Sequence, residues 1–293
     1  MLHPFNPANE AAYHAWREQK LAAYPVSSDQ LIVDIKNPAV LTATELEALR
    51  SCCRKANMVI YRTACGSDPD KEISRAMARQ LARQLGLSRM DRNLLADEDG
   101  VTPLSVAQAG ERQNYIPYTN RALKWHTDGY YNTDDRRIWA FQLHCVQAAA
   151  EGGENALLDH EIAYLLMRDE NPDFIVAMMQ ADAMTIPART DDEGVARPAQ
   201  TGPVFYIDPV SGALHMRYTA RKRSIEWKQT ADTLGAVAFL ENLLAGSSPY
   251  IFHARFAPGM GLFCNNVLHD RTPFRDDEQQ QRLIYRARFY DRV

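Results

Sequence analysis

The stretch "RLIYRARFYD" (282–291) alternates between apolar and basic side chains. Side chains two residues apart in a β-strand point to the same face, so the alternation predicts a strand with two unlike faces. The apolar face would carry Leu283, Tyr285, Ala287 and Phe289. The other face would be mainly basic, with Arg282, Ile284, Arg286, Arg288 and Tyr290. The basic face suits either a sheet surface in water or the mouth of a small barrel, where guanidinium groups can hold carboxylates.

Similar short β-type runs recur from about residue 103 onward. They lie at 136–147, 155–159, 183–188, 203–208, 212–218, 250–256 and 259–266, and helical insertions interrupt them at 160–180 and 230–246. Many short strands separated by Gly, Pro and Asp turns indicate a sandwich or barrel rather than a parallel sheet. We therefore predict a mainly β fold with flanking helices. The stretch 188–202 is the most loop-like, and either a lid or an inert surface loop would fit it.

Residues 1–102 show a mixed helix and strand pattern. Helices are predicted at 6–24, 42–57 and 70–86, and strands at 31–35 and 58–63. Asn6 is the expected cap of the first helix, with Pro7 at its first position. Thr42 and Glu45 have the spacing of a capping box. We predict a single domain over 1–293, in which 1–102 packs on a barrel formed by 103–293.

The composition of this chain is that of a water-soluble globular protein. It has 293 residues, of which 46% are hydrophobic and 24% charged, and a formal charge of −4. That charge argues against a general nucleic-acid binder, because phosphate recognition needs a basic surplus. The basic stretch "RYTARKR" (217–223) is short, and we interpret it as a solvated loop.

Cysteine usage and hydropathy favour a cytoplasmic protein without a membrane partner. The five cysteines are Cys52, Cys53, Cys65, Cys145 and Cys264, and they form no C-x-x-C pair, as is typical of a reducing compartment. The N-terminal stretch lacks the basic and apolar segments of a secretion signal. No run approaches the roughly 18 to 20 apolar residues of a membrane span.

A candidate metal site begins in "ALKWHTDGYYN" (122–132), where His126 and Asp128 would project together from a strand end. The best third ligand is His269 in "GLFCNNVLHDRTPF". Two histidines and one carboxylate on one face of a metal are typical of non-haem Fe(II) oxygenases, with positions left open for a cosubstrate and dioxygen. A zinc hydrolase and a non-catalytic barrel that binds a small acid are the alternatives, although no H-E-x-x-H motif is present.

Four segments in a fixed order make the resemblance specific: "WHTDGYY" (125–131), "EGGENALLD" (151–159), "CNNVLHDRTPF" (264–274) and "QRLIYRARF" (281–289). With them the chain resembles the taurine- and chlorophenoxyacetate-type (TauD/TfdA) family of Fe(II)/2-oxoglutarate-dependent dioxygenases. That family includes taurine dioxygenase and the γ-butyrobetaine hydroxylases. The resemblance implies a double-stranded β-helix (jelly-roll) core, and Fe(II), 2-oxoglutarate and dioxygen as cofactor and cosubstrates.

The resemblance also implies roles for particular residues. His126, Asp128 and His269 would hold the iron, and Arg282 would hold the distal carboxylate of 2-oxoglutarate. Asn155 stands where many relatives have a hydroxyl that helps to bind this carboxylate, and an amide can donate a similar hydrogen bond. Further residues would meet the substrate: Arg286 at an acidic group, and Tyr130, Tyr131 and Trp139 as pocket aromatics, although ordinary core aromatics would give the same pattern.

The activity implied is hydroxylation of a small organic acid, betaine or amino-acid-like substrate, with release of succinate and carbon dioxide. Because related halogenases lack the carboxylate ligand, Asp128 favours hydroxylation over halogenation. Desaturation and cleavage of a carbon–heteroatom bond, for example in a sulfonate, remain alternatives with the same cofactors. The expected partner is a small-molecule substrate. The resemblance also allows a homo-oligomer, since relatives often associate.

Overall fold

The computed structural model describes residues 3–63, 71–92, 97–191 and 194–293. The chain forms two compact units, each assembled from segments that are far apart in the sequence. The larger unit consists of Pro25–Leu123, Ile138–Leu157 and Phe252–Val293. The other consists of Met1–Tyr24, Lys124–Arg137 and Leu158–Ile251. The prediction of a single domain over 1–293 stays a prediction.

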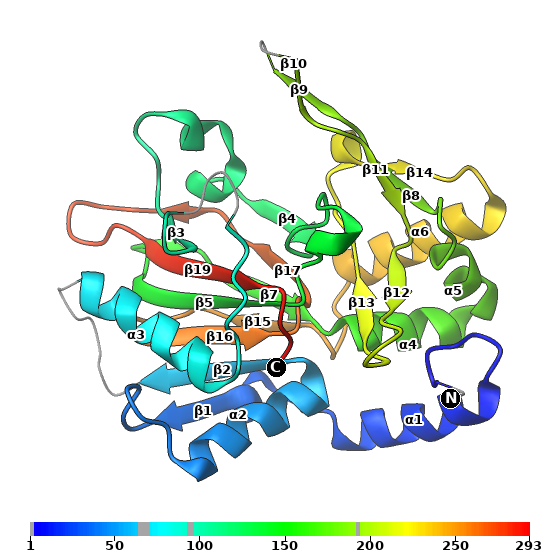
Figure 1. Ribbon diagram of the computed structural model, residues 1–293, viewed down its shortest axis with the longest axis horizontal. Helices are drawn as coiled ribbons and strands as arrows, with labels where there is room; N and C mark the ends of the chain where they lie inside the picture. The colour runs from blue at the N-terminus through cyan, green and yellow to red at the C-terminus, as the bar shows by residue number, and fades with distance from the viewer. Residues whose placement is uncertain (1–2, 64–70, 93–96, 192–193) are drawn as a thin grey trace. The chain divides into compact units, whose positions relative to one another are not determined.

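A six-stranded sheet is the centre of the larger unit (Figure 1), in the order β1-β2-β16-β5-β19-β3. Its strands are β1 (Ile32–Ile35), β2 (Met58–Thr63), β16 (Met260–Cys264), β5 (Ala140–Gln147), β19 (Leu283–Phe289) and β3 (Val101–Leu104). Only β1 and β2 run parallel among the pairs of this sheet. The predicted strand at the C-terminal end therefore lies inside the sheet, between β5 and β3.

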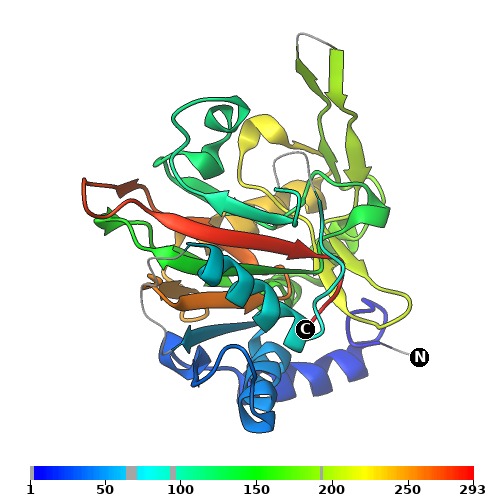
Figure 2. The same cartoon turned by 60° about the vertical axis from the view of Figure 1, so that its left-hand side comes forward.

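Helices α2 (Ala43–Ala56) and α3 (Lys71–Gln84) cover one face of this sheet (Figure 2). The predicted capping box is present at the start of α2, where Thr42 and Glu45 exchange hydrogen bonds. Leu49 of α2 and Leu81 of α3 belong to one buried cluster with strand residues such as Phe263. Apolar burial at this face is the main favourable contribution to the stability of the layer.

Both faces of β19 are buried, so the interpretation with a solvated arginine face is wrong. Arg288 is only 2% exposed and Arg282 only 5%. Arg288 pairs with Phe141 in the neighbouring strand β5, and cross-strand partners share a face. The Phe141 ring lies 4.6 Å from the His269 ring, centroid to centroid. The basic face of β19 is therefore the face of the sheet on which His269 is found.

A second sheet has four strands in the order β15-β7-β17-β4, namely Phe252–Ala254, Asn155–Leu158, Leu268–Arg271 and Leu123–His126. A two-stranded ribbon pairs β18 (Phe274–Arg275) with β6 (Glu151–Gly152). Gly152 has φ +71°, and a Cβ built there would lie 2.2 Å from the carbonyl oxygen of Pro273. Only glycine fits this pairing without a shift of the backbone.

The smaller unit carries the helices α1 (Glu10–Ala23), α4 (His160–Glu170), α5 (Pro172–Met178) and α6 (Ala231–Ala245). The predicted start of α1 is wrong, because the side chain of Asn9, and not of Asn6, caps the helix. The predicted helix 160–180 is divided. Asn171 ends α4 and caps α5, whose first residue is Pro172. Among the described residues, no helix combines the length and apolar character needed to cross a membrane.

Short strands complete the smaller unit. A three-stranded sheet has the order β11-β8-β14 (Gln200–Gly202, Met184–Ile186 and Glu226–Trp227), and β12 (Phe205–Ile207) pairs with β13 (Leu214–Met216). The stretch 188–202 is not a loop. It contains β9 (Arg189–Asp191) and β10 (Gly194–Arg197), an antiparallel pair that extends from β8 and β11 as a ribbon (Figure 2), and only 192–193 lie outside the described residues.

Candidate metal centre and cosubstrate site

His126 is the last residue of β4, and Asp128 follows it by two positions. Both side chains are buried, with 7% and 4% exposure. Gly129 then takes φ +67°, and the carbonyl of Gly129 accepts a hydrogen bond from Asn132 N at 2.8 Å. Glycine adopts this left-handed conformation at little cost, so the chain turns directly after Asp128. The sequence Asp-Gly therefore ends the strand at the point where the two polar side chains project.

His269 is the second residue of β17. The chain enters this strand through Asn266, which has φ +52°. Asparagine is one of the few residues besides glycine that visits this region readily. The Asn266 side-chain amide donates to the carbonyl of Ile138 at 2.7 Å, which fixes the turn. The pair Asn265–Asn266 is thus a local reason for the position of His269.

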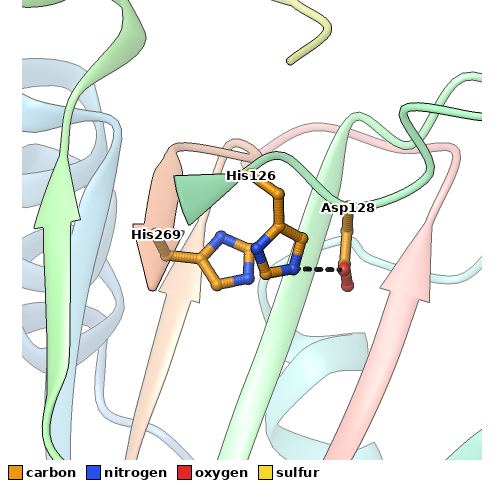
Figure 3. A group of neighbouring side chains, drawn as sticks. All are labelled: His126, Asp128 and His269. Atoms are coloured by element: carbon orange, nitrogen blue, oxygen red, sulfur yellow. Dashed lines mark ion pairs between the residues drawn. The ribbon is translucent and has the colours of Figure 1, made fainter. Parts of the chain in front are cut away.

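The side chains of His126, Asp128 and His269 point toward one another (Figure 3). Each offers one ligand atom, and these atoms all lie within 4.8 Å of one another. Nε2 of His126 is 3.7 Å from Oδ1 of Asp128. Two nitrogens and a carboxylate oxygen at this spacing can converge on one divalent ion, while charged groups so buried would otherwise be costly.

Hydrogen bonds to the backbone leave the same ring nitrogen available in both histidines. Nδ1 of His126 lies 2.9 Å from the carbonyl oxygen of Lys124, and Nδ1 of His269 lies 3.1 Å from that of Val267. A carbonyl can only accept, so Nδ1 carries the hydrogen in the neutral ring and Nε2 keeps its lone pair. This is the usual arrangement of histidines that bind a metal. The donor set fits Fe(II).

Arg282 precedes β19 and is buried without an ion pair among the described residues. Its Nη1 atom has no hydrogen-bond partner there. Burial lowers the pKa of Arg282 to about 10, so the guanidinium is still charged at neutral pH. It lines a small pocket with Gly153, Arg255 and Phe256. A buried cation with an unused donor fits the carboxylate of a bound ligand such as 2-oxoglutarate.

The remaining predicted residues occupy different settings. Asn155 is buried in β7 and donates through Nδ2 to the carbonyl of Asp270 at 2.6 Å, which leaves one amide hydrogen for another acceptor. Arg286 is half-buried in β19, opposite Leu143 of β5. Trp139 lies directly before β5, half-buried, with its backbone N–H on the carbonyl of Phe289.

Tyr130 and Tyr131 lie in the turn after Asp128 and are both half-buried. Their rings are 5.1 Å apart and nearly perpendicular. The guanidinium of Arg197 lies 5.4 Å from the centre of the Tyr131 ring. These two tyrosines are therefore not core residues packed on all sides, and they border a basic group rather than an acidic one.

Two arginines escaped the sequence interpretation. Arg271, two residues after His269, is 3% exposed and donates to the carbonyls of Pro117, Thr119 and Arg121, so it holds the segment before β4. Burial lowers the pKa of Arg271 to about 9. The other is Arg217 in "RYTARKR" (217–223). The interpretation of this stretch as a solvated loop is wrong for its first residues, because Arg217 is only 6% exposed.

Comparison with known sequences identifies the family. A profile described as "Taurine catabolism dioxygenase TauD, TfdA family" matches residues 19–288. The chain belongs to this TauD/TfdA family. The predicted family is thereby confirmed. A uridine-5'-phosphate dioxygenase from an Amycolatopsis species is 32% identical over 170 residues. This match covers 56% of the present chain and 59% of the length of the uridine-5'-phosphate dioxygenase.

Solved structures confirm the predicted fold class, mainly β with flanking helices and a jelly-roll core. The non-heme iron oxygenase OrfP, solved with Fe and alpha-ketoglutaric acid, has a TM-score of 0.63 at 18% identity. The match covers 96% of this chain and 92% of the OrfP chain. An asparagine oxygenase solved with Fe(II), 3-hydroxyasparagine and succinate has a TM-score of 0.58 at 15% identity, with 88% and 93% coverage. A taurine dioxygenase from Burkholderia xenovorans has a TM-score of 0.57 at 16% identity, with 91% and 89% coverage.

Proposed function

We propose that this protein is an Fe(II)/2-oxoglutarate-dependent dioxygenase that hydroxylates a small organic acid, betaine or amino-acid-like substrate. His126, Asp128 and His269 would hold the iron, and Arg282 the distal carboxylate of 2-oxoglutarate. The observation that carries the proposal is the convergence of three buried ligand atoms within 4.8 Å of one another. The buried guanidinium of Arg282, which has an unused donor, supports the cosubstrate role.

The metal with 2-oxoglutarate and dioxygen would supply the oxidation, in which one oxygen atom enters the substrate and the other enters succinate. The chain's own contribution is ligation, orientation and exclusion of water. The backbone carbonyls of Lys124 and Val267 fix both imidazole rings before the metal binds. Asp128 supplies the negative charge that offsets the charge of the ion. Arg282 would orient the cosubstrate through a paired, charge-assisted hydrogen bond.

Fe(II)-dependent formation of succinate from 2-oxoglutarate tests this proposal. We expect turnover in the wild type, even without the proper substrate at a low uncoupled rate, and none in His126→Ala or Asp128→Ala. His253→Ala is a matched control, because His253 is exposed and, among the described residues, forms an ion pair only with Glu154. Unchanged turnover in the two site variants would remove the metal assignment. Zinc-dependent hydrolysis without use of 2-oxoglutarate would favour the hydrolase alternative.

A nucleotide substrate is the second candidate, because the uridine-5'-phosphate dioxygenase is 32% identical over 170 residues. Two structural neighbours were instead solved with hydroxylated amino acids, the asparagine oxygenase with 3-hydroxyasparagine and OrfP with (3S)-hydroxy-L-arginine. A screen for substrate-stimulated succinate formation with nucleotides, amino acids, betaines and sulfonates separates these classes. Mass analysis of the product then distinguishes hydroxylation from desaturation and from cleavage of a carbon–heteroatom bond. A reducing compartment such as the cytoplasm belongs to the same proposal, since the metal must stay ferrous.

A further inference from the structure

The segment Arg217–Arg221 ("RYTAR") pairs with the strand that carries His126. His126 and Thr219 form an antiparallel bridge. Thr127 N donates to the carbonyl of Tyr218 at 3.0 Å, and Ala220 N donates to that of Trp125 at 2.8 Å. Directly opposed residues of antiparallel strands place their side chains on the same face, close together. Thr219 therefore lies beside His126, on the face of the metal ligands.

Side chains in an extended chain alternate between two faces, which places two arginines on the face of Thr219. Arg217 and Arg221 are two residues to either side of Thr219, so they share its face. By the register of the bridge, Arg217 stands opposite Asp128. Tyr130 reaches the same place, because its hydroxyl hydrogen-bonds with Thr219. Its pKa is raised by burial, and the nearby Arg221 and Arg197 act in the opposite direction.

The charged side chain of Arg217 is buried, although its hydrogen bonds within the described part of the chain are only to backbone carbonyls. Its Nη2 donates to the carbonyls of Gln200 at 3.1 Å and of Met184 at 3.5 Å, and its Nε has no hydrogen-bond partner among the described residues. No ion pair to Arg217 occurs there. The nearby carboxylate of Asp134 is bound to Arg137 at 2.6 Å. Burial lowers the pKa of Arg217 to about 10, which leaves the guanidinium charged at neutral pH. A buried charge without a counter-ion is costly unless a ligand supplies one.

Arg197 brings a second such cation to the same region. It is half-buried, its Nη2 donates to the carbonyl of Pro187 at 2.8 Å, and no ion pair to it is found among the side chains that the structure describes. Gln200 is the cross-strand partner of Ile186, the residue before Pro187. The carbonyls that hold Arg197 and Arg217 are therefore neighbours at the base of the β9–β10 ribbon.

We propose that Arg217 and Arg197, with Arg221 at the rim, bind the phosphate group of the substrate, which is a small phosphate monoester. This rests on the proposed dioxygenase function. A phosphate monoester carries a charge of about −1.5 to −2 at neutral pH, so it needs two cations, whereas a carboxylate or sulfonate needs one. Guanidinium groups match phosphate oxygens with paired hydrogen bonds. The rings of Tyr130 and Tyr131 offer an apolar surface to the rest of the molecule.

The affinities of matched ligands test the proposal directly. Uridine 5'-monophosphate, ribose 5-phosphate, uridine and taurine would be titrated by calorimetry into the anaerobic protein loaded with Fe(II) and 2-oxoglutarate. We expect a phosphorylated ligand to bind at least roughly 10-fold more tightly than its unphosphorylated counterpart. Equal affinity for uridine 5'-monophosphate and ribose 5-phosphate would show that the site recognises the phosphate group alone. Tighter binding of the nucleotide would show that the site also contacts the nucleoside. Equal affinity for uridine and its monophosphate, or preference for taurine, would overturn the proposal.

Variants separate recognition from a structural role of Arg217. Arg217→Met and Arg197→Met should each weaken the phosphate ligand by roughly 10- to 100-fold and leave uridine binding unchanged. Arg223→Met, an exposed change of the same charge in the same stretch, should change neither. Arg217→Lys keeps the positive charge but loses the paired guanidinium hydrogen bonds, and it replaces Arg217→Met as the test variant if Arg217→Met fails to fold. Equal weakening of both ligands, or the same loss in Arg223→Met, would contradict the proposal.

The failure of the underlying function has a different signature. Calorimetry of uridine 5'-monophosphate with the metal-free protein reads the phosphate site without iron. Binding that depends on Arg217, in a protein that never forms succinate, would refute the dioxygenase function and keep the anion site. Succinate formation without discrimination between phosphorylated and unphosphorylated ligands would keep the dioxygenase function and refute the phosphate site.

Discussion

Arg282 shows what a single residue contributes at the cosubstrate site. Its guanidinium is 5% exposed and retains a buried donor without a partner. Arg282→Met should therefore weaken 2-oxoglutarate binding, because loss of a buried charged partner costs about 2 to 5 kcal/mol. Ferrous binding should be unchanged, since Arg282 is no ligand. Calorimetric titration of 2-oxoglutarate measures the effect, and Arg275→Met, at an exposed arginine of β18, is the control. Wild-type affinity in Arg282→Met would contradict the role.

His144 in β5 predicts how stability depends on pH. It is 1% exposed, and burial lowers its pKa from 6.5 to about 4. The unfolded chain therefore binds this proton more readily than the folded protein, and stability falls as the pH drops from about 6.5 toward 4. The full effect is about 3 kcal/mol. Thermal melting of the wild type and of His144→Gln across this range checks it. An equal pH dependence in both proteins would exclude His144 as the cause.

The sequence could predict those residues whose roles depend on local spacing. His126 and Asp128 are two positions apart at a strand end, and a strand places them together by its own geometry. The role of Arg217 was not predictable in this way. Its stretch is basic in a chain of net charge −4, which is typical of an exposed loop. Its burial depends on pairing with β4, which is about ninety residues away, and no local pattern encodes that pairing.

At the scale of elements, the β6–β18 ribbon depends on one glycine. A Cβ at Gly152 would meet the Pro273 carbonyl oxygen at 2.2 Å, and φ is +71° there. Gly152→Ala should therefore destabilise the protein by at least about 1 to 3 kcal/mol, through the backbone strain and the clash together. Gly86→Ala is the matched control, because Gly86 also has a positive φ, of +92°, but nothing lies within 4 Å of its Cβ position. Denaturant unfolding compares them, and an equal loss in both would show that φ alone matters.

Local signals predicted most elements but misjudged some boundaries. The capping box at Thr42 predicted the start of α2 correctly. Asn6 and Asn9 are equally good caps by type, and the structure selects Asn9, whose side chain accepts from Ala12 N. Pro172 was a usable signal for the break between α4 and α5, since proline favours the first position of a new helix. The β9–β10 ribbon was missed because its Asp, Glu and Gly content is typical of a turn.

At the scale of the whole molecule, metal binding should raise the folding stability. A ligand that binds only the folded state stabilises it in proportion to the logarithm of its concentration over Kd. Mn(II), a redox-stable substitute, should therefore raise the Tm of the wild type by several degrees, and a chelator should reverse the shift. His269→Ala should lose the shift, whereas His14→Ala, at an exposed position in α1, should keep it. The same shift in His269→Ala would place the metal elsewhere.

Fold class and family could be predicted from the whole sequence because four motifs occur in one order, a pattern far more specific than any of them alone. The convergence of His269 with His126 and Asp128 is of another kind, since these residues are far apart in the chain. Their proximity depends on sheet pairing and not on local spacing. The four motifs also do not predict the substrate, because the arginines that we assign to substrate binding lie outside all four of them.

In the proposed enzyme, His126, Asp128 and His269 hold ferrous iron beside a cosubstrate that Arg282 binds. Anaerobic titration with Fe(II) and 2-oxoglutarate tests this arrangement most directly, through the metal-to-ligand absorption band of the chelate. We predict a saturable band at one iron per chain in the wild type, no band in His126→Ala, Asp128→Ala or His269→Ala, and a band that needs far more 2-oxoglutarate in Arg282→Met. A band of wild-type intensity in the three ligand variants would contradict the account.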